Sequence, residues 1–308
     1  MRGISYPELT LESPICNKFM ANLFHLGCAV WAYKGWVGDF YPAGTSSSKY
    51  LSLYSQHFMT VECNSTFYAV PNPSVLSSWG DRTPPEFRFC PKFPRDLTHQ
   101  GLLAPQIPAA QKFLTYMQEL GDRLGCPFIQ LPPQYGSHNF ADLEEFLVAL
   151  GNTPTHLALE VRHRSWFQPP HEDRLNQLLE ANNISRVILD TRPIYESERS
   201  PDLDCRKPDL PVHFTTTANH ILIRYISHPD RSYNQAYFQE WRSYLSLWLS
   251  QGKTIYFFVH CPQEDYSPRN AFDLQQLLES SGILTPPSPQ LTMVGNNQNT
   301  ATQMSLFS

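Results

Sequence analysis

Eight short apolar segments recur along this chain at intervals of about 33 residues, and seven of them are followed by a segment with amphipathic helical spacing. Short apolar runs predict buried strands, whereas apolar residues three and four positions apart predict helices. We expect strands at Leu23–Ala29, Thr60–Asn64, Phe87–Lys92, Phe128–Leu131, Leu157–Val161, Arg186–Asp190, His220–Ile226 and Thr254–His260. We expect helices at Ser46–His57, Pro73–Arg82, Pro108–Leu124, Phe140–Leu150, Glu172–Ala181, Gln235–Ser250 and Arg269–Ser280. The interval is the length of one strand, one helix and two turns, so it predicts an α/β fold.

Eight strands alternating with helices predict a TIM-like (β/α)8 barrel, a single domain over residues 23–283. The alternative is a doubly wound open sheet. The chain has only 14 glycines and contains neither GxGxxG nor GxxxxGK[ST], which weighs against the nucleotide-binding forms of that sheet. Residues 1–22 are predicted to be an N-terminal extension, and residues 284–308 a disordered polar tail.

The composition narrows the classes of partner. The net charge of −5 excludes a global basic field that attracts nucleic acid or anionic membrane, although a local basic pocket remains open. No apolar run approaches the roughly 18 residues of a membrane span. The seven cysteines are scattered with no CxxC pair, which is typical of reduced thiols. These features predict a soluble, cytoplasmic protein without a membrane partner.

Polar residues gather at the carboxyl ends of the predicted strands, where (β/α)8 barrels carry their chemistry. Glu62 and Asn64 are two positions apart and therefore share one strand face, as do Glu160 and Arg162. Five further strand ends carry Lys92, Gln130, Asp190, Arg224 and His260. The amino ends show nothing comparable. An ion-pair network that only closes the barrel end is the alternative, but buried pairs add little net stability. The pattern therefore favours a functional site.

Three cations set against three carboxylates suit an anionic substrate and a general base. We expect Glu62, Glu160, Lys92 and Asp190 to be catalytic, with Glu62 or Glu160 as the base. Lys92, Arg162 and Arg224 are predicted to clamp the anion, and Asn64 and Gln130 to orient it. Hydrolysis of a phosphodiester or sugar phosphate fits this set.

A divalent metal is the second interpretation of the same residues. Glu62, Glu160, Asp190 and His260 supply the oxygen-rich ligands that such a metal prefers. Neither HExxH nor a paired-histidine spacing supports it, so the cofactor stays open. Cys63 and Cys90 lie in mid-strand, where buried and inert thiols are the usual case.

Aromatic residues follow several of the strand ends, namely Trp31, Trp36, Tyr41, Phe67, Tyr68, Trp166 and Phe167. They predict an aromatic wall that stacks on a sugar ring or a nucleobase, although aromatic side chains also fill cores. We expect Trp31, Tyr68 and Trp166 to contact the substrate, and His99 to donate a proton.

With these residues collected, the chain resembles the YecE-like family, also known as domain of unknown function 72. The first matching segments are Gly27-Cys28-Ala29-Val30-Trp31 with Phe40-Tyr41-Pro42, the segment from Val61 to Tyr68, and Lys92-Phe93-Pro94 with Thr98-His99. They continue with Gln130-Leu131-Pro132-Pro133, with Glu160-Val161-Arg162-His163, with Ser165-Trp166 and with Asp190. The resemblance covers roughly residues 23–280 and implies a TIM-like barrel. It implies no particular reaction.

Two segments depart from the family pattern. Arg224-Tyr225-Ile226-Ser227 stands where the family usually has arginine, an aromatic residue, histidine and glycine. Val259-His260-Cys261 stands where the family often has asparagines. The resemblance therefore extends to Arg224 and not to His260.

The end of the chain, Gln303-Met304-Ser305-Leu306-Phe307, resembles the short peptide by which bacterial proteins dock on the DNA polymerase sliding clamp. A flexible tether that carries a Leu-Phe anchor suits an apolar pocket, with Gln303, Leu306 and Phe307 as the contacts. Together these features predict an enzyme for a phosphorylated or nucleic-acid-derived substrate, with DNA repair as its setting. The alternative is a non-catalytic module that binds a nucleic-acid end or an anionic small molecule.

Overall fold

Nine short strands form the centre of the molecule in the computed structural model, which describes residues 23–151, 153, 155–196 and 207–284. The strands are β1 (Phe24–Cys28), β2 (Thr60–Cys63), β3 (Arg88–Pro91), β4 (Phe128–Gln130), β5 (Leu157–Glu160), β6 (Ile184–Arg186), β7 (Ile188–Asp190), β8 (His220–Ile226) and β9 (Thr254–His260). The predicted N-terminal extension and C-terminal tail lie outside the described residues, apart from Leu284.

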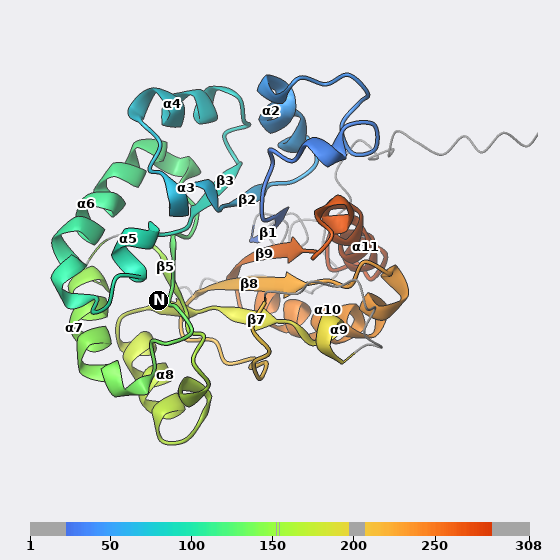
Figure 1. Cartoon of the computed structure of the whole chain (residues 1–308). Helices are drawn as coiled ribbons and strands as arrows, with labels where there is room; N and C mark the ends of the chain where they lie inside the picture. Colours follow the sequence, from blue (N-terminus) through green and yellow to red (C-terminus); the bar gives the residue numbers. More distant parts are fainter. Residues whose placement is uncertain (1–22, 152, 154, 197–206, 285–308) are drawn as a thin grey trace, which may run out of the picture.

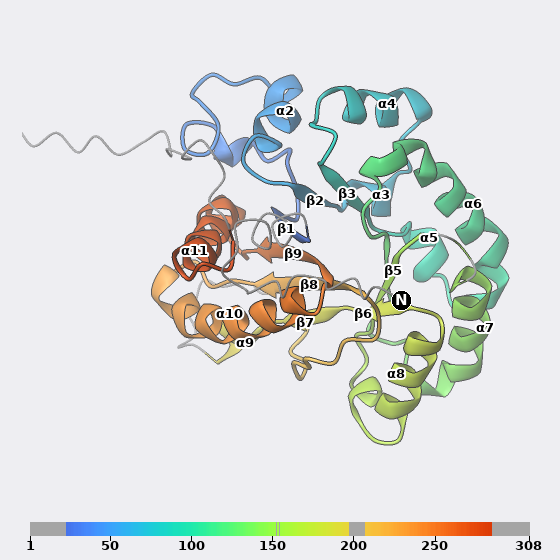
Figure 2. The same cartoon turned by 180° about the vertical axis from the view of Figure 1, so that it is seen from behind.

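Helices alternate with the strands and surround them (Figures 1 and 2). The α-helices are α2 (Tyr50–Tyr54), α3 (Ser65–Tyr68), α4 (Pro73–Asp81), α5 (Arg95–Thr98), α6 (Ile107–Met117), α7 (Phe140–Gly151), α8 (His171–Ala181), α9 (Arg192–Tyr195), α10 (Gln235–Ser250) and α11 (Ser267–Ser280). Single turns of 3-10 helix span Lys34–Trp36, Ser47–Lys49, Ala104–Gln106, Ser137–Asn139, Arg164–Phe167, Arg231–Asn234 and Glu264–Tyr266, and a longer 3-10 segment spans Gln118–Arg123. Among the described residues, none of the helices combines the length and apolar character needed to cross a membrane.

All the ladders are parallel, and they form three sheets with the orders β1-β9-β8-β7, β2-β3 and β4-β5-β6. Smaller links join the sheets. A single bridge between Lys92 and Phe128 connects the end of β3 to β4. Val187, which separates β6 from β7, donates its N–H to the Leu159 carbonyl of β5 at 2.9 Å. A Cβ at Gly27 of β1 would lie 2.0 Å from the Thr60 carbonyl oxygen, so glycine permits β1 to approach β2 closely.

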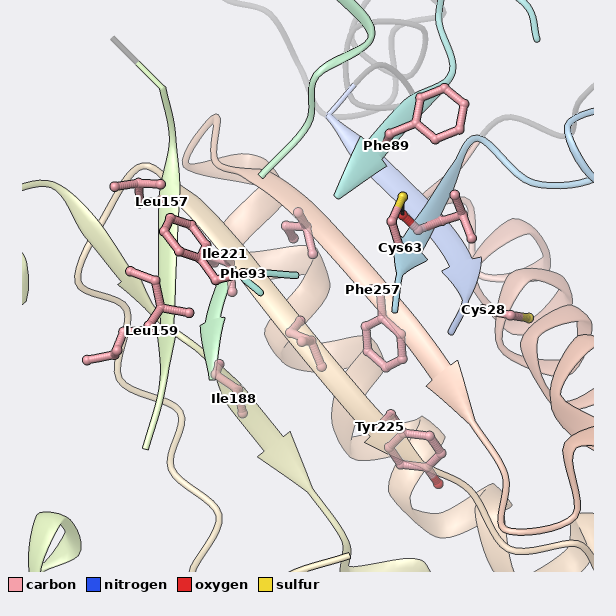
Figure 3. Close-up of a cluster of buried hydrophobic side chains, with 14 of the residues drawn as sticks. Cys28, Cys63, Phe89, Phe93, Leu157, Leu159, Ile188, Ile221, Tyr225 and Phe257 are labelled. Carbon is pink, nitrogen blue, oxygen red and sulfur yellow. Dashed lines mark hydrogen bonds between the residues drawn. The ribbon is translucent and has the colours of Figure 1, made fainter. Parts of the chain in front are cut away.

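Two hydrophobic cores lie on opposite faces of the strands. The outer core packs against the helices. The ring centroid of Tyr225 lies 5.0 Å from that of Phe238 of α10, and the ring centroid of Phe257 lies 5.4 Å from that of Trp241 of the same helix. Figure 3 shows part of it, with side chains from all three sheets. The inner core is a separate cluster of Cys90, Cys126, Phe128, Ala158, Val187, Leu222, Tyr256 and Phe258. Both faces of the strands are therefore buried, as parallel sheets require.

The observed elements confirm the predicted α/β alternation, and β8, β9 and α10 have the predicted bounds. Two helix predictions were too long. The helix expected over Pro108–Leu124 is α6 only as far as Met117, and a 3-10 segment follows in which Gly121, at φ 55° and ψ −135°, leaves the helical conformation. The helix expected over Ser46–His57 is only α2 with one 3-10 turn before it. The predicted strand over residues 186–190 is divided at Val187 into β6 and β7.

Candidate functional site

The polar residues at the strand ends continue the inner core. Side chains two positions apart on a strand point to the same side. Cys90, Phe128, Ala158, Leu222 and Phe258 belong to the inner core, and the residues two positions later are Lys92, Gln130, Glu160, Arg224 and His260. With Glu62 of β2 they form what we call the polar cluster, and each of its six members is at most 7% exposed. The cluster therefore closes the inner core at the carboxyl ends of the strands.

Glu62 is held by four hydrogen bonds. Arg224 donates from Nε to Oε2 and from Nη2 to Oε1, both at 2.8 Å, which makes the pair bidentate. Asn64 donates from Nδ2 to Oε1 at 2.7 Å, as proximity in the sequence predicts, although Asn64 lies beyond the end of β2 with helical backbone angles of φ −67° and ψ −21°. His260 Nε2 lies 3.0 Å from Oε2. An ionised carboxylate only accepts, so Nε2 carries the proton of a neutral His260.

Glu160 links the two halves of the cluster. Its Oε2 accepts from Arg224 Nη1 at 2.5 Å, and its Oε1 accepts from Arg162 Nε at 2.6 Å and from Gln130 Nε2 at 2.9 Å. The same Gln130 accepts from Lys92 Nζ through Oε1 at 2.7 Å. One guanidinium therefore bridges both carboxylates, and one amide joins Glu160 to Lys92.

The two carboxylates are ionised and weakly basic. Burial alone would raise the pKa of each, but Arg224 and His260 hold the pKa of Glu62 well below its usual range. Arg224 and Arg162 likewise overcome burial and lower the pKa of Glu160 to about 2. A general base works best with a pKa near the operating pH. The predicted role of Glu62 or Glu160 as the base is therefore disfavoured, because the same contacts that hold the carboxylates also remove their basicity.

Lys92 is the group of the cluster whose pKa lies near neutral pH. Burial, followed by the charge of Arg224, lowers its pKa to about 7, although Glu160 and Glu62 oppose the shift. Burial also lowers the pKa of Lys207, and Arg224 adds to that shift. The sequence analysis missed Lys207, which lies between α9 and β8 and forms no hydrogen bond through its ammonium with the described residues.

A third carboxylate near the cluster is neutral at pH 7. Burial raises the pKa of Glu264 to about 8, in spite of the opposing charge of Lys207. Its backbone carbonyl accepts from the indole of the buried Trp36 at 2.9 Å, which fixes the loop after β9. Glu264 therefore contributes little negative charge beside Lys207 at pH 7.

Helix α3 fixes the aromatic side of the site. The Thr66 hydroxyl donates to the carbonyl of Cys63 at 2.8 Å and to that of Lys92 at 2.7 Å, so it ties β2 to β3. Phe67 thereby lies over Lys92, with Nζ 3.9 Å from the ring centroid. His99 packs edge-on against the same ring, with 5.1 Å between the ring centroids. Tyr68, packed against Phe67, is 80% exposed.

The structure does not bring Asp190 together with the polar cluster. Its carboxylate accepts from Arg192 Nη2 and from Trp241 Nε1 of α10, both at 2.9 Å, so it points to the helix layer. The strand face that carries Asp190 also carries Ile188, which belongs to the outer core. Asp190 is a fully buried structural anchor for α9 and α10.

Most of the predicted aromatic wall is core. Trp166 is fully buried and donates its indole N–H to the Tyr135 carbonyl at 2.8 Å, so it cannot stack on a ligand. Trp31 packs edge-on against Trp79 of α4 at 5.1 Å and against Phe89 of β3. Trp36 and Tyr41 are also buried. Among the predicted substrate-binding aromatics, Tyr68 is therefore exposed, Trp31 is half-buried and Trp166 is fully buried.

The predicted metal-ligand set is not assembled. Arg224 already occupies oxygens of both Glu62 and Glu160, and Asp190 lies on the other face of its strand. Within residues 23–284, leaving aside the undescribed positions, no group of three or more His, Cys, Asp or Glu side chains is placed to hold a metal ion. Cys63 and Cys90 are buried, and burial raises the pKa of both thiols, in agreement with inert side chains.

The family model described as "Protein of unknown function DUF72" matches residues 25–292. The chain belongs to the DUF72 family. Its relatives in the family include the UPF0759 protein YecE of Escherichia coli K12, which is 35% identical over 277 residues, covering 87% of this chain and 98% of that protein. The UPF0759 protein YunF of Bacillus subtilis 168 is 26% identical over 289 residues, covering 85% and 97%.

Two solved DUF72 structures are similar to this one. A family protein of Enterococcus faecalis V583 aligns with a TM-score of 0.64 at 18% identity, covering 89% of this chain and 99% of that one. Another from Thermotoga maritima MSB8 aligns with a TM-score of 0.62 at 20% identity, covering 83% and 99%. At these identities the likeness concerns the fold.

Proposed function

We propose that this DUF72 protein is an enzyme that binds a phosphorylated or nucleic-acid-derived anion at the polar cluster and transfers a proton through Lys92. The observation that carries the proposal is an excess of basic groups that are buried or half-buried. Lys92, Arg162, Lys207 and Arg224 share a site with two ionised carboxylates, Glu62 and Glu160. Buried charge without a partner is costly, so an anionic ligand is the simplest compensation.

The residues then take distinct roles. Glu62 and Glu160 fix Arg224 and Arg162 rather than acting as bases, because their pKa values are held low. Arg162, 16% exposed at its side chain and engaged only through Nε by the described residues, presents its terminal nitrogens to the anion together with Lys207. Lys92, with a pKa of about 7, gives or takes the proton.

The proposal includes a closed TIM-like barrel. Three features support it: the inner core draws on strands of all three sheets, the Lys92–Phe128 bridge links β3 to β4, and Val187 links β5 to the β6–β7 strand. Charged residues at the carboxyl end of an inner core fit the usual place of a barrel active site. An experimental structure with a ladder between β1 and β2 would establish closure.

Lys207→Gln should lower the affinity for inorganic phosphate about ten-fold, because it removes a cation that no hydrogen bond within the described chain satisfies. Isothermal titration calorimetry measures the change, and the loss should shrink at high salt. Lys112→Gln, which removes an exposed lysine of α6, is the matched control. Equal affinities for Lys207→Gln and the wild type would remove Lys207 from the site.

A non-catalytic nucleic-acid module is the second candidate, and the exposure of Tyr68 favours it. A ring that is 80% exposed beside the site is suited to stacking on a base. Tyr68→Ala should weaken binding of a short single-stranded oligonucleotide by about 1 to 3 kcal/mol, while Tyr68→Phe keeps the ring and the affinity. Fluorescence anisotropy measures both, and unchanged affinity in Tyr68→Ala would count against base stacking.

A substrate screen separates the two candidates. An enzyme should turn over at least one phosphodiester, nucleotide or sugar phosphate, and Lys92→Gln should abolish that turnover. In a binding module, Lys92→Gln weakens binding and no substitution in the polar cluster changes any product.

The predicted sliding-clamp peptide, with Gln303, Leu306 and Phe307, lies outside the described residues and stays a proposal from the sequence. If it docks on the clamp, DNA repair is the natural setting of the enzyme. Deleting residues 303–308 should abolish binding of the full chain to a bacterial sliding clamp in surface plasmon resonance. Binding that survives the deletion would remove the peptide from the proposal.

A further inference from the structure

The surroundings of Lys92 suit an amine that exists both with and without its extra proton. Its side chain is 7% exposed, its amine donates to Gln130 Oε1 at 2.7 Å, and the ring of Phe67 covers it at 3.9 Å. Arg224, Glu160, Glu62 and Arg162 are the charged groups that act on it. No carboxylate among the described residues forms an ion pair with Lys92, since Glu160 reaches it only through the Gln130 amide. The amine can therefore lose its proton while keeping one fixed hydrogen bond.

We propose that Lys92 attacks the carbonyl carbon of a phosphorylated aldehyde or ketone and forms a protonated imine with it. This inference rests on the proposed function, because it uses the same site and assigns the substrate class. A buried lysine beside another cationic group is a usual form of a nucleophilic lysine, and Lys92 is buried beside Arg224. The covering ring of Phe67 and the Gln130 amide distinguish Lys92 from the anion-binding groups Arg162 and Lys207.

The reaction balances without an oxidant or reductant. The Lys92 nitrogen forms a C–N bond with the carbonyl carbon, and the carbonyl π bond breaks toward oxygen. The proton that leaves nitrogen goes to that oxygen, which gives a carbinolamine. A second proton, taken from solvent, converts the hydroxyl into water, and its departure leaves the protonated imine.

The groups around Lys92 suit this product as well as they suit the ammonium. The protonated imine retains one N–H, which the Gln130 Oε1 accepts in the place of the present hydrogen bond. Its positive charge lies over the Phe67 ring, where the π face stabilises a cation. The phosphate of the substrate is left to Arg162 and Lys207, the two basic groups of the site other than Lys92 that Glu62 does not bind through a hydrogen bond.

Reductive trapping tests the inference with the full chain. The protein is incubated at pH 7 with glyceraldehyde 3-phosphate and sodium cyanoborohydride, and the modified lysines are mapped by peptide mass spectrometry. Lys92 should be modified at least ten-fold faster than the exposed Lys112 of α6, with saturation as the aldehyde concentration rises. Inorganic phosphate should suppress the modification of Lys92. Unphosphorylated glyceraldehyde should modify Lys92 no faster than Lys112.

A second variant separates chemistry from binding. Lys92→Arg keeps a cation, so it should still bind glyceraldehyde 3-phosphate in calorimetry and should lose the rapid adduct, with its fold checked by thermal melting. If the wild type binds this phosphate ester but modifies Lys92 no faster than Lys112, or modifies Lys207 instead, the imine is overturned and the anion site stands. If the wild type binds neither phosphate nor the ester, both the imine and the proposed function fall.

Discussion

Replacing Arg224 with methionine should lower the free energy of unfolding by about 3 to 5 kcal/mol at pH 7. The guanidinium is 2% exposed and donates to both Glu62 and Glu160. Methionine fills a similar length but leaves two buried carboxylates without their shared cation, and the desolvation cost of each then stands uncompensated. Urea denaturation followed by circular dichroism measures the change.

The loss should depend on pH in a definite direction. In the wild type, the pKa of Glu62 and that of Glu160 are lowered from 4.5, so their stabilising contribution is present above that value and is lost as the pH falls through the folded values. In the variant, burial without Arg224 should raise both pKa values instead. The carboxylates then take up protons on acidification, so the difference between the two proteins should shrink by more than half between pH 7 and pH 4.

Asp190→Asn is the matched control for Arg224→Met. It also weakens a buried ion pair, that of Asp190 with Arg192, but on the helix side of the strands. It should reduce stability and leave phosphate binding unchanged, whereas Arg224→Met should abolish that binding. An Arg224→Met protein as stable as the wild type at pH 7 would show that this guanidinium does not hold the carboxylates.

The strand pattern was sufficient to predict which residues pair locally. Glu62 with Asn64, and Glu160 with Arg162, are two positions apart, and both pairs form hydrogen bonds, although Asn64 and Arg162 lie just beyond the ends of β2 and β5. The strand period could not place Asp190 in the same way. Its strand has apolar residues on both faces, Val187 on one and Ile188 on the other, so the sequence leaves the inward face undetermined.

Protonation states could not be predicted, because they depend on contacts between distant segments. The sequence around Glu62 is compatible with a general base. In the fold, however, Arg224, 162 residues away along the chain, binds Glu62 through two nitrogens. Lys207 had no strand pattern around it that would have marked it. The aromatic residues show the same limit. Trp166 and Tyr68 both follow strand ends, yet one is fully buried and the other is 80% exposed.

Lys92→Met should abolish turnover and should also remove a pH-dependent instability from the folded protein. An unfolded lysine keeps its proton up to its ordinary pKa of 10.5, whereas Lys92 in the folded protein loses it at about 7. Between these values the unfolded state binds more protons, so wild-type stability should rise with pH. From pH 6 to pH 10 this rise should be on the order of 4 kcal/mol.

Methionine cannot titrate, so the variant should lack this rise. The loss of the hydrogen bond to Gln130 costs stability too, but Gln130 does not titrate, so that cost is the same at every pH. The free energy of unfolding of Lys92→Met minus that of the wild type should therefore be most favourable to the variant at pH 6 and should fall as the pH rises. Urea denaturation at a series of pH values measures it, with Lys112→Met as the control for removal of one lysine.

A site that keeps a lysine buried at the expense of stability needs a reason to keep it, and function is the reason available here. Buried charges are often replaceable by apolar residues with no loss of stability. A gain in stability for Lys92→Met at pH 6, together with loss of turnover, would show that the amine is retained for chemistry. Parallel pH profiles for the two proteins would instead show that Lys92 keeps its proton well above pH 7 in the folded state. Both the proton transfer and the imine assigned to it would then fail.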